Sequence, residues 1–152
     1  VCASWFSLSL GHSRQNFPEI NSGSEIPSPA DQPFQISWTN MLSMGKWNLG
    51  TILLCSSGRP YIDYATSSNH LPVERNYKRL PDYFRTDLSV NRNFAVGRVK
   101  LKGGIALINI FDTQNYFDVN TRKFDFENSS FSETTLIQSQ PFSVNMFIHF
   151  AL

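Results

Sequence analysis

The stretch RLPDYFRTDLSVNRNF, residues 79–94, decides the fold class. From Phe84 to Phe94 every second residue is mostly apolar, and the residues between them are all polar. Successive side chains of a β-strand point to opposite faces, so this alternation predicts a strand with one apolar and one polar face. The question is whether the apolar face lies against a protein core or against lipid.

Five further runs alternate in the same way, and no run of comparable length has a helical period. They cover residues 1–10, 33–43, 46–56, 99–111 and 142–152. The last of them, FSVNMFIHFAL, places six large apolar side chains on one face. The sequence therefore predicts an all-β chain with six long antiparallel strands.

The lengths of these runs and of their connections favour lipid. Strands of globular proteins are most often about five to six residues long, whereas strands of membrane barrels need about nine to eleven. Five of the six runs have at least eleven residues, and the first has ten. The connections alternate between two short ones, MG and AVGR, and three long ones over residues 11–32, 57–83 and 112–141. Short turns at one end and long loops at the other are typical of outer-membrane barrels.

Composition points the same way and excludes several functions. Charged residues make up 16% of the 152 residues and aromatic residues 14%, against roughly 25% charged residues in soluble domains. The net charge is +1 and the Lys and Arg residues are spread out, so no nucleic-acid partner is expected. No run of about 18 apolar residues exists, which excludes a transmembrane helix, and a barrel would not need one. Cys2 and Cys55 are too few for a disulfide framework and lack the spacing of metal ligands.

Aromatic residues stand at both ends of the predicted strands, as expected at a membrane–water interface. Trp47 and Phe94 lie beside the short connections, and Tyr83, Phe84 and Phe111 lie beside the long ones. One residue of the apolar set, Arg92, is charged, but it lies next to a short connection, from which its long side chain can reach lipid headgroups. We therefore expect the apolar face to contact lipid.

Six strands cannot close a barrel on their own. Bacterial single-chain barrels use at least eight strands, and lipid leaves no water to satisfy an open sheet edge. We therefore expect residues 1–152 to be an incomplete domain, an arc of a larger transmembrane β-barrel whose first and last strands pair with polypeptide outside this sequence.

Three motifs resemble those of a known family. Their residues are Ser57, Gly58, Pro60 and Tyr61; Leu80, Pro81, Tyr83, Arg85 and Asp87; and Asn109 and Phe111. In this order and spacing they resemble the last strands of TonB-dependent outer-membrane receptors, most closely those of the Bacteroidota type. The resemblance covers nearly the whole chain, firmly from about Pro33 and loosely from Val1.

The resemblance implies the C-terminal part of a 22-stranded barrel in the bacterial outer membrane, which imports a scarce nutrient with energy passed on by TonB. The partners it implies are the rest of the barrel and its plug, the TonB complex through an N-terminal part outside this sequence, the lipid bilayer and, in some receptors, a surface lipoprotein. It implies no cofactor and no enzymatic activity. The family usually ends in an aromatic residue, and this chain departs from it by ending in Leu152.

No catalytic constellation is present. His12, His70 and His149 stand apart from cysteines or paired carboxylates, and the acidic residues within 118–128 do not have the spacing of an EF-hand. The Asn128-Ser129-Ser130 sequon carries little meaning in a bacterial protein.

The candidate binding residues are those expected to face the barrel interior. They are Arg85, Asp87, Asn91, Lys100, Lys102, Asn145 and His149. Each could contact a plug or a passing solute, or could belong only to the polar inner wall that every such barrel has. Arg85 and Asp87 lie two apart on one face, so their spacing allows a local ion pair, which in a hydrated interior would contribute little to stability.

Two alternatives stay open. The same barrel arc could serve as a scaffold in an outer-membrane complex without import. A soluble β-sandwich that binds a ligand would instead bury all six apolar faces in one core and fold in water.

Overall fold

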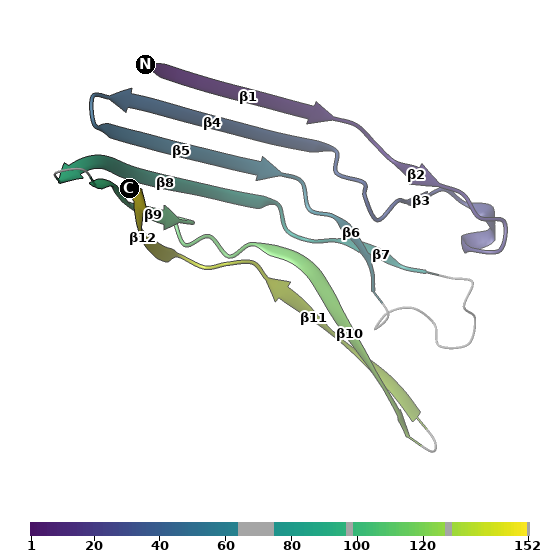
Figure 1. Cartoon of the computed structure of the whole chain (residues 1–152). Helices are drawn as coiled ribbons and strands as arrows, with labels where there is room; N and C mark the ends of the chain where they lie inside the picture. The colour runs from purple at the N-terminus through teal and green to yellow at the C-terminus, as the bar shows by residue number, and fades with distance from the viewer. Residues whose placement is uncertain (64–74, 97–98, 127–128, 152) are drawn as a thin grey trace.

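The computed structural model describes residues 1–63, 75–96, 99–126 and 129–151. Its main element is a six-stranded sheet in the order β1-β4-β5-β8-β9-β12, with every neighbouring pair antiparallel (Figure 1). The strands are β1 (Cys2–Leu10), β4 (Phe34–Met44), β5 (Trp47–Ser56), β8 (Tyr83–Val96), β9 (Val99–Ile108) and β12 (Ser143–Ala151). Within this sheet each strand pairs with the sheet strand that follows it along the chain, which confirms the predicted all-β class and the six predicted long strands.

The long connections contain more structure than predicted, all of it at one end of the sheet (Figure 1). They hold β2 (Arg14–Gln15), β3 (Ile26–Pro27), β6 (Pro60–Ile62), β7 (Tyr77–Arg79), β10 (Tyr116–Phe126), β11 (Ser129–Gln138) and a short 3₁₀ helix, η1 (Asn21–Gly23). These strands form three two-stranded ribbons: β2 with β3, β6 with β7, and β10 with β11. The expectation that residues 112–141 form only a loop was wrong, because β10 and β11 make a long hairpin there.

The strand predicted over residues 99–111 ends earlier, at Ile108. Asn109 and Asp112 have φ values of 53° and 49°. These left-handed conformations are incompatible with a continuous strand, so the backbone turns there instead.

The register keeps apolar side chains in line across the whole sheet. One row of cross-strand neighbours is Cys2, Leu42, Leu49, Val90, Ile105 and Met146. The adjacent row, on the opposite face, is Ala3, Met41, Gly50, Ser89, Ala106 and Asn145. All six strands thus turn their apolar sides to one face, which we call the apolar face, and their more polar sides to the other, the polar face.

The apolar face has no protein packed on it in the described part of the chain. The buried apolar residues are Ile26 and Leu80, which lie in the connections, whereas Met146 and Ile148 on the apolar face are 77% and 69% exposed. The accessible surface is 10790 Å², against about 7,800 Å² for a compact protein of this mass. The sheet is open, and the six strands lie in one layer rather than in two packed sheets. Among the described residues, no helix is long and apolar enough to cross a membrane.

Some polar side chains on the apolar face are hydrogen-bonded to one another, whereas Thr86 Oγ1 and Arg92 Nε have no partner among the described residues. Trp38 Nε1 donates to Ser4 Oγ at 2.9 Å, and Ser4 Oγ donates to Asn40 Oδ1 at 2.7 Å. Asn40 Nδ2 in turn donates to Thr51 Oγ1 at 3.2 Å. This polar row therefore crosses β1, β4 and β5 with its members satisfying each other's hydrogen-bonding groups.

Candidate functional site

The predicted binding residues all lie on the polar face, but the structure does not gather them into one site. Arg85 and Asp87 lie near the start of β8, at the end of the sheet with the long connections. Lys100, Lys102 and His149 lie at the opposite end, near the short connections. Asn91 and Asn145 lie between these two groups, where Asn91 Oδ1 accepts a hydrogen bond from Asn48 Nδ2 at 3.0 Å.

Arg85 and Asp87 form the predicted ion pair. Arg85 Nε and Nη2 donate to the Asp87 carboxylate at 2.8 Å and 2.6 Å, and the side chains are 23% and 15% exposed. The same carboxylate accepts a hydrogen bond from the backbone N–H of Asn109 at 2.9 Å. The pair thus fixes the turn after β9 to β8, so these two residues have a structural role in the chain.

The group near the short connections is basic. Lys102 is in register with His149 on β12 and with Asn93 on β8, and Lys46 and Lys100 line the same hollow of about 400 Å³. Residues 88–111 contain four Lys or Arg and no Asp or Glu, so no acidic residue of that segment can neutralise this group. The described residues contain no cluster of His, Cys, Asp and Glu suited to a metal ion.

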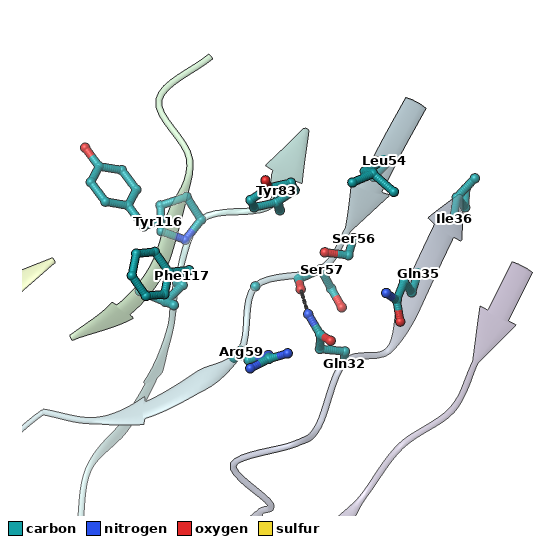
Figure 2. Close-up of a pocket in the computed structure, with 14 residues that line it drawn as sticks. Gln32, Gln35, Ile36, Leu54, Ser56, Ser57, Arg59, Tyr83, Tyr116 and Phe117 are labelled. Carbon is teal, nitrogen blue, oxygen red and sulfur yellow. Dashed lines mark hydrogen bonds between the residues drawn. The ribbon is translucent and has the colours of Figure 1, made fainter. Parts of the chain in front are cut away.

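A pocket at the other end of the sheet was not predicted (Figure 2). Its volume is about 380 Å³, within the range of small-molecule sites. Its wall includes Gln35, Leu54, Ser56 and Tyr83 from the long strands, and Gln32, Ser57, Arg59, Tyr116 and Phe117 from the connections and β10. The pocket thus lies where the connections meet the polar face of the sheet.

The chemistry of this pocket suits reversible binding of a polar solute. Gln32 Nε2 donates to the Ser57 carbonyl at 3.2 Å, and the guanidinium of Arg59 makes no hydrogen bond or ion pair with another described residue. Tyr116 and Phe117 add aromatic surface. Amide, guanidinium and aromatic groups can hold a ligand by hydrogen bonds and stacking, and the described residues of the lining include no Asp, Glu or His.

A sequence motif could have indicated this pocket. A Cβ atom built on Gly58 would lie 1.7 Å from the carbonyl oxygen of Leu80. Only glycine therefore lets the Ser-Gly-x-Pro-Tyr segment pack against Leu80 and Pro81, and both segments line the pocket. Besides their resemblance to a family, the two motifs thus bring the two ends of one connection, residues 57–83, together.

A buried acidic residue, Asp31, holds the connections in place beside the pocket. One carboxylate oxygen accepts a hydrogen bond from the backbone N–H of Ser13 at 2.7 Å, and the other is paired with Arg79 Nη2. Arg79 Nη1 also donates to the carbonyls of Asp31 and Gly58, both at 3.0 Å. The hydrogen bond from Ser13 and the pairing with Arg79 hold the pKa of the Asp31 carboxyl below its usual value.

We expect this carboxylate to make the first long connection sensitive to acid. Because the pKa of Asp31 is lower in the folded state than the usual value of about 3.9, its stabilising effect is complete above that pH and is lost as the pH falls through the folded-state pKa. Pepsin cleavage of residues 11–32, followed from about pH 5 to about pH 2, should rise steeply at the acid end. Asp31→Asn should be cleaved faster already at the higher pH, with a flatter profile, and identical profiles would contradict this role.

Of the remaining predicted features, His70 and the Asn128 sequon lie outside the described residues, as does Leu152. Cys2 and Cys55 are free and lie on the apolar face. Comparisons of the chain with protein-family models, with curated proteins and with solved structures found no match. The resemblance to TonB-dependent receptors therefore stays a prediction from the sequence motifs.

Proposed function

We propose that this chain is the C-terminal arc of a TonB-dependent receptor barrel in the bacterial outer membrane, and that it forms part of the wall of a nutrient import path. The observation that carries the proposal is the uncovered apolar face, which runs in register across all six strands opposite a polar face. A barrel wall with lipid outside and a hydrated lumen inside needs this arrangement.

The hydrogen bonds on the apolar face support lipid as the surrounding medium. A bilayer offers no water to polar groups, so a hydrogen-bond partner within the protein lowers the free-energy cost of each polar side chain there. Ser4, Asn40 and Thr51 do so through the polar row that crosses three strands. A water-exposed face would not require these pairings.

The two outer strands of the sheet also support an arc rather than a complete barrel. β1 and β12 each pair with one neighbour only among the described residues, β4 and β9 respectively. Their outer edges expose backbone hydrogen-bonding groups, which lipid cannot satisfy. In the proposed barrel further strands cover both edges.

In this proposal the chain performs no covalent chemistry. The pocket at the long connections lies at the outer mouth of the barrel, where a solute arrives first. The polar face then lines the path that the solute follows inward. The acidic and basic residues of that face set which charges pass easily.

The proposal is tested on the native polypeptide, by measuring its intact mass and N-terminal sequence in an outer-membrane fraction. A mass several times 17.3 kDa with a plug and a TonB-binding segment upstream is expected. Uptake of a panel of labelled nutrients should then fall when the gene is deleted and when TonB is inactivated. A membrane barrel without a plug and without TonB-dependent uptake would favour the scaffold alternative, and a short chain in the soluble fraction would contradict the membrane location.

A further inference from the structure

A shallow hollow opens on the apolar face near the short connections, and it is separate from the pocket described above. Its volume is about 590 Å³, within the range of small-molecule sites. Residues that line it include Arg92, Phe94, Gly103, Ile105, Met146 and Ile148.

The hollow exists because Gly103 has no side chain. Gly103 lies in register between Arg92 on β8 and Ile148 on β12. Neighbouring strands are about 4.8 Å apart, so the two flanking residues are separated by roughly 10 Å across this gap. The hollow continues toward the middle of the sheet, where Ile105 and Met146 face each other.

Arg92 stands at the end of the hollow nearest the short connections. Its Cζ lies 4.9 Å from the ring centroid of Trp47 and 5.0 Å from that of Phe94, so two aromatic rings hold the guanidinium in place. Its Nε is shielded and has no hydrogen-bond partner, and the guanidinium makes no hydrogen bond or ion pair with another described residue. Residues 88–111 contain no Asp or Glu, and Asp87, the one acidic residue of β8, lies on the polar face paired with Arg85, so β8 and β9 offer Arg92 no counter-ion.

We propose that this hollow binds an anionic phospholipid, with one acyl chain over Gly103 and the phosphate on Arg92. The proposal rests on the membrane location proposed above and adds a specific ligand to it. An unpaired guanidinium complements a phosphate in charge and geometry, and the apolar groove that leads from it toward the middle of the sheet suits an acyl chain. The headgroup then lies at the strand ends, and the chain lies along the strands toward the bilayer centre.

The test uses the complete native protein in vesicles that contain a phosphatidylglycerol or a phosphatidylcholine with a photoreactive acyl chain. After irradiation, labelled peptides are located by mass spectrometry. We expect phosphatidylglycerol to label residues 99–108 and 143–151 about fivefold more than phosphatidylcholine does. Arg92→Gln should abolish this preference, and Arg92→Lys should retain part of it, because the charge remains without the planar fork.

Two further variants control for the hollow and for net charge. Gly103→Leu should reduce labelling by both lipids, since the nearest atoms to a Cβ at this position are 3.7 Å away and the side chain can fill the hollow without a clash. Arg14→Gln removes the same charge from the first long connection, at the other end of the sheet from the hollow. This variant should retain the preference for phosphatidylglycerol.

The outcomes separate this inference from the proposed function. Equal labelling by the two lipids in the unmodified protein would overturn the role of Arg92. Labelling of β4 and β5 without labelling at the hollow would overturn the lipid site and leave the membrane location standing. No labelling anywhere on the apolar face would overturn both proposals.

Discussion

Replacing Met146 by Arg is expected to destabilise the folded protein by about 2–4 kcal/mol, whereas Asn145→Arg should change its stability by less than about 0.5 kcal/mol. The two residues are neighbours on β12 and lie at the same height along the sheet, but on opposite faces. Met146 belongs to the apolar row, so in a barrel its arginine variant places a charge in the hydrocarbon. In the proposed barrel Asn145 faces the hydrated interior, where a charge is tolerated.

The unfolding free energy of each variant can be measured by urea titration of the complete protein in phospholipid vesicles, followed by tryptophan fluorescence. The difference in stability between these two variants shows whether lipid or water contacts the apolar face. It does so more directly than a measurement of where the protein is located in the cell. Met146 is 77% exposed, so in a soluble protein its replacement by Arg would be close to neutral. Equal stability of the two variants would contradict the membrane location of the apolar face.

Asn109→Gly is expected to destabilise the folded state by about 2–3 kcal/mol, and Asn109→Ala by about 1 kcal/mol more. The Asn109 side chain is fully buried, and its Nδ2 donates to the carbonyls of Thr113 at 3.0 Å and Gln140 at 3.2 Å. Its Oδ1 accepts a hydrogen bond from the backbone N–H of Thr113 at 3.1 Å. Both variants leave these backbone groups without partners in the protein.

The order of the two variants identifies the cause of the additional loss. Asn109 has a φ of 53°, which glycine adopts freely and alanine does not. Glycine is usually the more destabilising replacement, because it loses more backbone entropy on folding. Thermal unfolding of both variants under identical conditions would therefore show alanine as the less stable one, and the reverse order would contradict a strained left-handed turn at this position.

The long strands could be predicted because their alternation is a local property of the sequence. Residues 84–94 show it clearly, and the structure confirms β8 there. The alternation does not predict the β10–β11 hairpin, because polar and apolar residues occur on both sides: Phe117 and Val119 alternate with Asp118 and Asn120, but Thr121 then follows on the side of Val119 and Phe124 on the side of Asn120. No sustained period-two pattern results, although the two strands pair along their length with one irregularity in register between Tyr116 and Asp118.

In the candidate site, too, local features could be predicted from the sequence and long-range ones could not. The Arg85–Asp87 pair was predictable, because two residues that are two positions apart on a strand lie on the same face. The pocket was not predictable, because Gln32, Arg59 and Phe117 come from three separate connections. Asn115 illustrates the difficulty: its side-chain amide accepts from the Phe84 N–H at 2.8 Å and donates to the Phe84 carbonyl at 2.7 Å, a pairing across 31 residues that no local pattern reveals.

The polar row on the apolar face has a consequence for the order of assembly. Asn40 on β4 and Thr51 on β5 satisfy each other only after these two strands have paired, and Ser4 joins them only after β1 has docked. An isolated strand that entered hydrocarbon would carry an unsatisfied amide or hydroxyl group, at a cost of about several kcal/mol. In the proposed barrel, insertion strand by strand is therefore disfavoured for this part of the chain, and we expect β4 and β5 to enter the bilayer together as a preformed hairpin.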